Sequence, residues 1–413
     1  MNYHIMVDEK FIDDFINDAE AAAPTNNIYI INSNATALKF VKNPLARHLP
    51  MCSIRFWKTI SQINANDKLW IHWLSADAAR LMIYLSSSIE VGLFFWGADI
   101  VATPSQQYQE FNYDAENLTF ILKSRSQKKE KILVFSTAKA LLIKAKILAV
   151  AAIGGGLRLG ISNFKSQLYY SGTSAHKQLK LKAAALKRIS YFMGFNSYDL
   201  EWIKERFDCN ALFVYFFYEV GANSALDQPT ITAYAAQKKT FTIWLGNSAS
   251  TTNNHLDALI TLSKLPYDCI EKIISPLNYG DESVDKIYTK TVVELGKKLF
   301  KEKFQPLFVY IPRAAYYELL ATCDAVFFYH NRSQGAGNIM IALALEKQVF
   351  LKKQNTLHQL LTTSDAIQVY SSAGITNEDL QKFDKKIAAS NKKSAVQLFD
   401  NEIKLKNLST YLS

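Results

Sequence analysis

Short apolar runs alternate with helical patterns along most of the 413-residue chain. The runs are rich in Ile, Val, Phe and Trp, as are strands that are covered on both faces of a parallel sheet. The helical patterns between them indicate βαβ units, so the sequence predicts an α/β fold with doubly wound parallel sheets. The predicted strands are residues 3–7, 27–32, 68–74 and 90–96 in the first half, and 211–217, 241–245, 271–277, 306–311, 325–329 and 348–352 in the second.

The middle of the chain, residues 123–205, breaks this alternation. Residues 136–156 predict a helix that ends at three glycines, and residues 175–194 predict a second helix. Fifteen Lys and Arg residues stand against a single Glu over residues 123–188. Positive charge concentrated in this way favours an anionic partner, which is either nucleic acid or an anionic membrane surface.

Length and pattern together predict two domains, residues 1–205 with the basic helical segment and residues 206–413, with the last helix either in the second domain or packed back on the first. No apolar run reaches the roughly 18–20 residues of a membrane span. The N-terminus lacks the pattern of a secretory leader. The four cysteines lie far apart without metal-ligand spacing, which predicts reduced thiols in a cytoplasmic protein.

Three polar loops follow predicted strands in the second half, where parallel sheets bind their ligands. They are "GNSASTTNNH" at residues 246–255, "SPLNYGD" at 275–281 and "HNRSQGAGNI" at 330–339. Gly335 and Gly337 allow backbone N–H groups to approach an anion, and Arg332 can grip phosphate oxygens. His330 can donate a hydrogen bond. The alternative for any one loop is an ordinary turn with a helix N-cap.

Two residues of the first half, one just after a predicted strand and one within a predicted strand, are candidates for acid–base chemistry. Asp99, in "FFWGAD", follows a predicted strand and is the better candidate for a general base. Its alternative is a helix N-cap or a surface charge. His72 lies within the run at 68–74, and its alternative is a histidine satisfied inside the core.

The loops carry a resemblance to a known family. Residues 246–259, 275–281 and 323–345, together with "FFWGAD", resemble the 4-acetamido-4,6-dideoxygalactose transferases of enterobacterial common antigen synthesis. These enzymes are the 4-alpha-L-fucosyltransferases of glycosyltransferase family 56. The resemblance implies a GT-B fold, in which two Rossmann-like domains face a central cleft. It also implies that the second domain binds the nucleotide-sugar and the first the acceptor.

The resemblance further implies a dTDP-linked amino sugar as donor and an oligosaccharide on undecaprenyl diphosphate as acceptor, with no bound metal or other cofactor. The enzyme is then expected on the inner face of the bacterial inner membrane, held peripherally through residues 123–188. Asp99, His72 and His330 become the catalytic candidates, and whether the reaction inverts or retains stays open. The donor-binding candidates are Gly246, Asn247, Ser248, Ser250, Asn253, Asn254, His255, Tyr279, Gly280, Asn331, Arg332, Gln334, Gly335, Gly337 and Asn338.

Two other classes of protein compete with a glycosyltransferase. A nucleotide-sugar epimerase or oxidoreductase is disfavoured because the chain has no GxGxxG fingerprint. A non-catalytic α/β protein that binds nucleic acid or membranes would explain the basic segment. Few aromatic residues interleave with its cations, however, and the polar loops would be left without a role, so nucleic acid is not expected as a partner.

Overall fold

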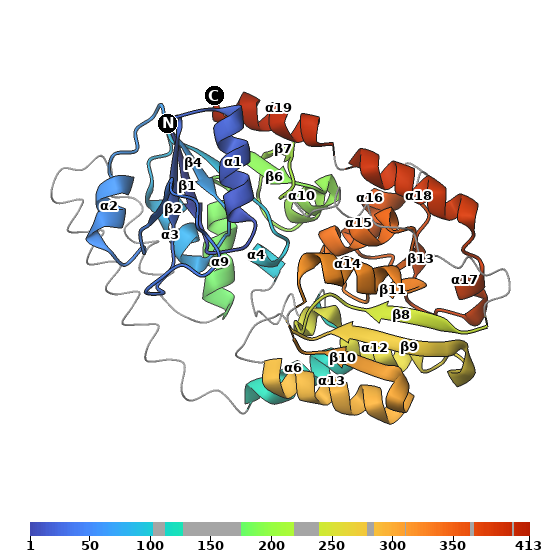
Figure 1. Ribbon diagram of the computed structural model, residues 1–413. Helices are drawn as coiled ribbons and strands as arrows, with labels where there is room; N and C mark the ends of the chain where they lie inside the picture. Colours follow the sequence, from blue (N-terminus) through green and yellow to red (C-terminus); the bar gives the residue numbers. More distant parts are fainter. Residues whose placement is uncertain are drawn as a thin grey trace. The chain divides into compact units, whose positions relative to one another are not determined.

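The computed structural model describes residues 1–101, 112–126, 175–218, 239–278, 285–309, 311–363, 367–398 and 400–413. They form two compact units, each built on its own parallel sheet (Figure 1). The first unit holds the described residues up to 101, then 175–218 and 401–413. The second unit holds 112–126 and the described residues between 239 and 400.

The first unit has a seven-stranded sheet in the order β3-β2-β1-β4-β5-β6-β7, with every pair parallel. Its strands are β1 (Asn2–Met6), β2 (Asn27–Ile31), β3 (Ala46–His48), β4 (Lys68–Ile71), β5 (Glu90–Phe94), β6 (Tyr191–Gly194) and β7 (Leu212–Tyr215). Its helices are α1 (Ile12–Ala22), α2 (Ile54–Ile60), α3 (Ala76–Tyr84), α4 (Ala98–Val101), α9 (Ala175–Leu186), α10 (Ser197–Lys204) and α19 (Asn401–Leu412).

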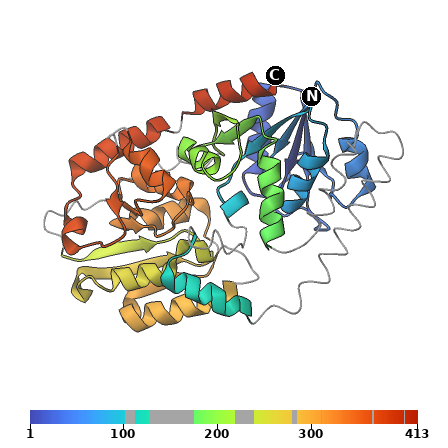
Figure 2. The same cartoon turned by 180° about the vertical axis from the view of Figure 1, so that it is seen from behind.

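Helices α1 and α19 cover one face of this sheet, while α3 and α9 pack together on the other (Figure 2). The pattern of α1 explains its position, because Ile12, Phe15, Ile16 and Ala19 recur at helical spacing and are buried. Helix α19 is tied to the same unit, since Lys404 forms an ion pair of 2.7 Å with Asp18. The last helix of the chain therefore packs on the first unit.

Several boundaries differ from those expected from the sequence. The predicted strand 211–217 appears as β7, which pairs with β6 in the first sheet rather than opening the second domain. Residues 191–194 form the strand β6, although the pattern predicted a helix through residue 194. A four-residue apolar run directly after an amphipathic helix has the same composition as a further helical turn. The predicted helix at 136–156 lies outside the described residues.

The second unit has a six-stranded sheet in the order β10-β9-β8-β11-β12-β13, again with every pair parallel. Its strands are β8 (Phe241–Leu245), β9 (Ile270–Pro276), β10 (Phe304–Leu307), β11 (Ala325–Phe327), β12 (Gln348–Leu351) and β13 (Tyr370–Ser371). Its helices are α6 (Ala115–Ser126), α12 (His255–Leu262), α13 (Asp285–Phe300), α14 (Arg313–Ala321), α15 (Ala336–Ala344), α16 (Thr356–Thr362), α17 (Asn377–Gln381) and α18 (Lys385–Leu398).

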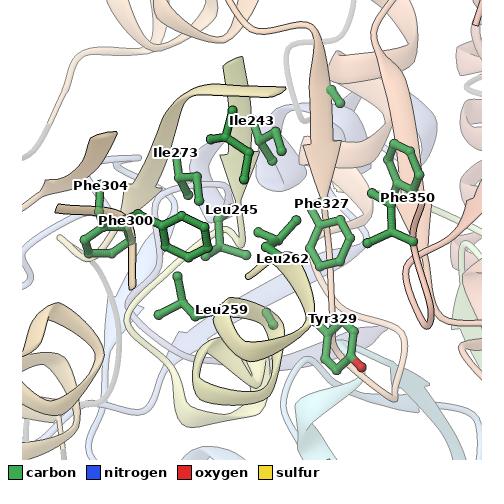
Figure 3. Close-up of a cluster of buried hydrophobic side chains, with 14 of the residues drawn as sticks. Ile243, Leu245, Leu259, Leu262, Ile273, Phe300, Phe304, Phe327, Tyr329 and Phe350 are labelled. Atoms are coloured by element: carbon green, nitrogen blue, oxygen red, sulfur yellow. The ribbon is translucent and has the colours of Figure 1, made fainter. Parts of the chain in front are cut away.

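One core layer of the second unit lies between its sheet and the helices α12 and α13. Leu259 and Leu262 of α12 pack beneath Ile243, Leu245 and neighbouring strand residues (Figure 3). These side chains are fully buried, and burying each contributes roughly 1.5–3 kcal/mol. The rigid core fixes where the strands end, and therefore where the polar loops begin.

Both sheets share one topological feature that positions ligands. In each, the chain builds outward from the first strand in one direction and then reverses, so that β1 borders β4 and β8 borders β11. Loops that leave neighbouring strands at such a switch point diverge to opposite faces of the sheet. The crevice between them is where doubly wound folds bind their ligands.

Candidate functional site

The loops after β8 and β11 meet at the switch point of the second sheet. Gly246 directly follows β8, and its N–H donates to the carbonyl of Phe327 at the end of β11 (3.1 Å). Gly246 has φ +72°, which favours glycine, and a Cβ there would lie 2.7 Å from His255 Nε2. Two of the three loops expected to bind ligand are thus brought together.

Asparagine side chains fix the shape of the loop after β8. The Asn253 carboxamide accepts from the Asn247 N–H (3.1 Å) and donates to the Ser248 carbonyl (3.2 Å). Asn254 has φ 54° and donates through Nδ2 to the carbonyl of Tyr329 (3.1 Å). Both side chains are fully buried, so these two donor-site candidates shape the loop and join it to the segment that follows β11.

Gln334 links the two loops directly. Its Nε2 donates to Asn247 Oδ1 (3.1 Å), and its Oε1 accepts from the Thr252 hydroxyl (2.6 Å). Thr252 also lies 2.9 Å from the Ser250 hydroxyl. Gly335 precedes α15 with φ +67°, and a Cβ there would press to 3.3 Å from the Asn247 side chain. A side chain larger than hydrogen would therefore push the two loops apart.

Arg332 reaches from the loop after β11 toward the loop after β8. Its guanidinium donates to the Ser333 carbonyl (3.0 Å) and to the Thr252 hydroxyl (3.4 Å). The side chain remains partly exposed. Gly337 and Asn338 lie in the first turn of α15, where Asn338 Oδ1 accepts from the Tyr316 hydroxyl (2.5 Å).

His330 lies three residues after β11 and has no exposed surface. Asn355 Oδ1 accepts from the Leu357 N–H (2.9 Å), so the atom 2.8 Å from His330 Nδ1 is Asn355 Nδ2, which can only donate and also donates to the carbonyls of His330 (3.1 Å) and Arg332 (2.8 Å). His330 Nδ1 therefore accepts, and the ring hydrogen lies on Nε2. Nε2 is buried and finds no hydrogen-bond partner among the described residues.

His255, the first residue of α12, also has a buried ring nitrogen without a hydrogen-bond partner among the described residues. The Tyr288 hydroxyl accepts from the His255 N–H (3.1 Å) and from Asn117 Nδ2 (2.9 Å). Its own hydrogen therefore points to His255 Nδ1 (3.1 Å), which places the ring hydrogen of His255 on Nε2. That nitrogen too is buried, with no partner in the part of the chain that the structure describes.

Both imidazoles are held neutral. Burial lowers the pKa of His255 to about 3. Burial, followed by the nearby charge of Arg332, lowers the pKa of His330 to about 3. A buried donor without a partner costs about 1–3 kcal/mol, and two of them at one switch point indicate a missing acceptor. An oxygen-rich anion at the ends of β8 and β11 would supply it.

Part of this site comes from residues that sequence reasoning missed. Asn355 follows β12, and the strand-end rule applied to that loop would have found it. Asn117 and Asp114 belong to the segment 112–126, which joins the second unit although the first sheet resumes after it. There Asp114 pairs with Lys352 and accepts from Asn331 Nδ2 (3.2 Å). No sequence pattern connects this segment to loops more than a hundred residues later.

The third expected loop is only partly described. Ser275 lies at the end of β9, and its hydroxyl donates to the Leu245 carbonyl (3.2 Å). Asn278 Nδ2 donates to the Val309 carbonyl (2.7 Å). Tyr279 and Gly280, expected to bind donor, lie outside the described residues. Most of the basic segment 123–188 lies outside them as well.

The two candidates of the first unit are buried and fully engaged. Asp99 accepts from the N–H groups of Trp96 (3.1 Å) and Leu74 (3.3 Å), and burial raises its pKa to about 6. His72 Nε2 lies 3.0 Å from His4 Nδ1, and His72 Nδ1 lies 2.6 Å from the Tyr218 hydroxyl. Burial holds the pKa of His72 well below its usual value. Neither side chain of Asp99 and His72 has exposed surface, which fits a role in holding strand-end loops.

Among the described residues, no group of three or more His, Cys, Asp and Glu side chains is arranged to hold a metal ion. Within the same residues, every helix is too short or too polar to cross a bilayer.

Comparison with protein families decides the class. The family described as 4-alpha-L-fucosyltransferase, glycosyl transferase group 56, matches residues 163–408, which is more than half of the chain. The chain belongs to this family. The match contains both loops at the second switch point, so the resemblance seen in the sequence is confirmed, and the protein is a glycosyltransferase.

Solved structures show the same fold at low sequence identity. HepE from Anabaena, solved with UDP and glucose, matches with a TM-score of 0.57 and 12% identity over 100% of this chain and 99% of its own. Sucrose-phosphate synthase from Thermosynechococcus elongatus matches with a TM-score of 0.57 and 8% identity over 99% and 98%. The trehalose-phosphate synthase of Burkholderia xenovorans matches at 0.53 and 9% over 99% and 99%. These likenesses confirm the predicted GT-B fold with two Rossmann-like domains.

Proposed function

We propose that this glycosyltransferase moves a 4-acetamido-4,6-dideoxyhexose from a dTDP-sugar to an oligosaccharide on undecaprenyl diphosphate. The family supports a deoxysugar donor, because it is described as a fucosyltransferase family. The motifs at residues 246–259 and 323–345 support the dTDP-linked amino sugar of common antigen synthesis, which they resemble. The product would enter a cell-surface polysaccharide.

The donor diphosphate would sit at the ends of β8 and β11. One observation carries this assignment: His255 and His330 each hold a buried Nε2–H without a described partner beside the glycine-rich loops. Phosphate oxygens accept hydrogen bonds, and the partly exposed guanidinium of Arg332 adds positive charge on the same loops. Because both rings stay neutral at physiological pH, they contribute oriented N–H dipoles rather than charge.

The chemistry then follows from this arrangement. The bond between the anomeric carbon and the diphosphate oxygen breaks, and that oxygen keeps the electron pair. The acceptor hydroxyl oxygen forms the new bond and loses its proton, which passes to solvent or to a phosphate oxygen of the departing diphosphate. Preorganised donors at the departing diphosphate lower the barrier because they need no reorganisation as its charge develops. We propose that His330, His255 and Arg332 supply this stabilisation without a bound metal.

Asp99 and His72 receive a different role in this proposal. A base must reach the acceptor hydroxyl to within hydrogen-bond distance, and both side chains lie beneath the surface of the first unit. We propose that they position the loops after β4 and β5.

A lipid-linked acceptor also requires the enzyme to attach to an anionic leaflet on the cytoplasmic side of the inner membrane. The fifteen cations of residues 123–188 are suited to such attachment.

A thermal-shift panel of dTDP, UDP, GDP and CMP tests the donor assignment. A ligand that binds only the folded state stabilises it by about 2.7 kcal/mol at a concentration of 100 times its Kd. We expect dTDP to raise the melting temperature most, and the Arg332→Ala variant to lose most of that rise. Equal stabilisation by all four nucleotides, or by none, would contradict the proposal.

A further inference from the structure

The first sheet has its own switch point, between β1 and β4, and aromatic side chains surround it. Phe11 follows β1, Trp73 follows β4, Trp96 follows β5 and Tyr218 follows β7. Because these strands are parallel, all four residues leave the same edge of the sheet. Each is partly exposed, whereas most aromatic residues within the strands are buried.

The four rings form one continuous cluster. Phe11 lies 4.7 Å from both Trp96 and Tyr218, measured between ring centroids, and Trp96 lies 5.4 Å from Tyr218. Trp73 extends the cluster, with its ring 5.5 Å from that of Trp96. Phe11, Trp96 and Tyr218 rest on the buried core of the unit, which fixes their positions. Rigid aromatic surface of this kind offers large contact area at little cost in side-chain entropy.

A buried hydrogen-bond chain beneath the cluster sets the direction of the Tyr218 hydroxyl. Asn27 Nδ2 donates to Glu20 Oε1 (3.1 Å) and to the Ala23 carbonyl (2.8 Å), so its Oδ1 faces His4 Nε2 (3.2 Å). His4 Nε2 must therefore carry the ring hydrogen, and His4 Nδ1 must accept.

The hydrogen-bond directions of His72 and Tyr218 follow from that of His4. Since His4 Nδ1 accepts, His72 Nε2 carries the hydrogen and His72 Nδ1 accepts from the Tyr218 hydroxyl at 2.6 Å. The single hydrogen of Tyr218 is committed to His72. Toward the cluster the Tyr218 oxygen can therefore only accept a hydrogen bond. The site combines aromatic faces with one oriented acceptor.

We propose that Phe11, Trp73, Trp96 and Tyr218 form the binding platform for a sugar ring of the acceptor. Aromatic rings suit the apolar C–H faces of a pyranose, and the Tyr218 oxygen suits a hydroxyl or acetamido N–H at its edge. The inference rests on the proposed function only in taking a saccharide as acceptor. Ligands of doubly wound sheets bind at switch points, which supports this position independently of the family.

Saturation-transfer NMR with free disaccharides tests the platform. The panel contains N-acetylhexosamine, neutral and uronic-acid disaccharides, with N,N′-diacetylchitobiose as the first probe. We expect Tyr218→Phe, which removes one oxygen, to weaken binding roughly 3- to 10-fold, as for one lost hydrogen bond. Trp96→Ala should weaken saccharide binding by about tenfold, because the variant loses both the stacking contact of the indole ring and the apolar area that the ring would bury.

Two controls make the result decisive. Trp202→Phe changes a partly exposed tryptophan of α10, away from the strand-end loops, and should leave saccharide binding unchanged. Stabilisation by dTDP, measured on each variant, reports the nucleotide site in the other unit. Lost saccharide binding with retained dTDP stabilisation supports the platform. Native protein that binds no disaccharide of the panel, or Tyr218→Phe and Trp96→Ala variants that bind like native, would overturn it whatever dTDP does.

Discussion

Each unit buries a pair of histidines near its switch point, and the two pairs differ in one respect. In the first unit, all four ring nitrogens of His4 and His72 have partners: Asn27, each other and Tyr218. In the second unit, Nε2 of His255 and Nε2 of His330 lack any partner within the described chain. Burial lowers the pKa in both pairs, so a shifted pKa does not distinguish them. The missing hydrogen-bond partner of the two Nε2 atoms is what distinguishes the second pair, and we take it as the sign of a ligand in the second unit.

The largest effect is expected from removing a ligand-facing donor. His330→Phe deletes the unpartnered Nε2–H, and kcat should fall about 10²- to 10³-fold, as when one transition-state donor is lost. Stability should stay level or rise, because a buried unsatisfied donor disappears while Asn355 Nδ2 keeps the backbone carbonyls of residues 330 and 332 as acceptors. Steady-state kinetics and a thermal melt of the same preparation measure both quantities.

His358→Phe is the matched control for that variant, since His358 lies on α16 of the same unit, outside the two loops. It should keep native turnover. A His330→Phe enzyme with native turnover, or one that loses stability by several kcal/mol, would make His330 an ordinary core residue.

The reverse pattern is expected in the first unit. His72→Phe leaves His4 Nδ1 and the Tyr218 hydroxyl without their partners, and each unsatisfied group costs about 1–3 kcal/mol. The free energy of unfolding should fall by about 2–6 kcal/mol, while dTDP still stabilises the protein. Urea denaturation with and without dTDP measures this. Unchanged stability together with lost turnover would show that His72 acts in the reaction and does not serve the buried hydrogen-bond network.

Acid should destabilise the protein through the same histidines. The pKa values of His4, His255 and His330 lie at about 3 in the folded state, below the ordinary 6.5. The unfolded chain therefore binds protons first as the pH falls below 6.5. Their contribution is complete above that pH and is lost toward pH 3, by about 1.4 kcal/mol per pH unit for each histidine.

Asp99 works in the opposite sense. Its pKa is raised to about 6, so its contribution is present below about pH 4 and is lost as the pH rises through 6. Between pH 4 and 6, the stability that Asp99 adds as the pH falls cancels the stability lost through about one of the histidines. Urea unfolding from pH 7 to 4 should show a steeper slope for the native protein than for His330→Phe. Identical slopes would mean that His330 is not held neutral by burial.

The smallest expected effect is none at all. If side chains and backbone N–H groups stabilise the departing diphosphate, dialysis against EDTA should leave turnover unchanged. The assay needs metal-free buffer and a magnesium add-back. Activity that disappears with EDTA and returns with magnesium would replace the neutral-donor account of the second unit by metal assistance.

The sequence predicted the α/β class and most strands because buried parallel strands have a recognisable composition. It also singled out two polar loops from their glycines and polar residues, and the structure joins these loops through Gln334. The state of the histidines could not be predicted. It depends on Asn355, Asn117 and Tyr288, which are neighbours only after folding.

The same limit applies to Asp99 and His72. A sequence does not report whether a side chain in or just after a strand faces solvent or lies beneath the loops, and both side chains are buried. The aromatic cluster went unnoticed for a related reason. Phe11, Trp73, Trp96 and Tyr218 come from four separate runs of the chain and share one edge only through the strand order.

Histidine ¹⁵N NMR with and without dTDP tests the central claim most directly. All four buried histidines should show neutral rings with the hydrogen on Nε2, each assigned by its own substitution. Addition of dTDP should shift the Nε2–H resonances of His255 and His330 and leave those of His4 and His72 in place. Resonances of His255 and His330 that do not respond to saturating dTDP, or that carry the hydrogen on Nδ1, would contradict the account.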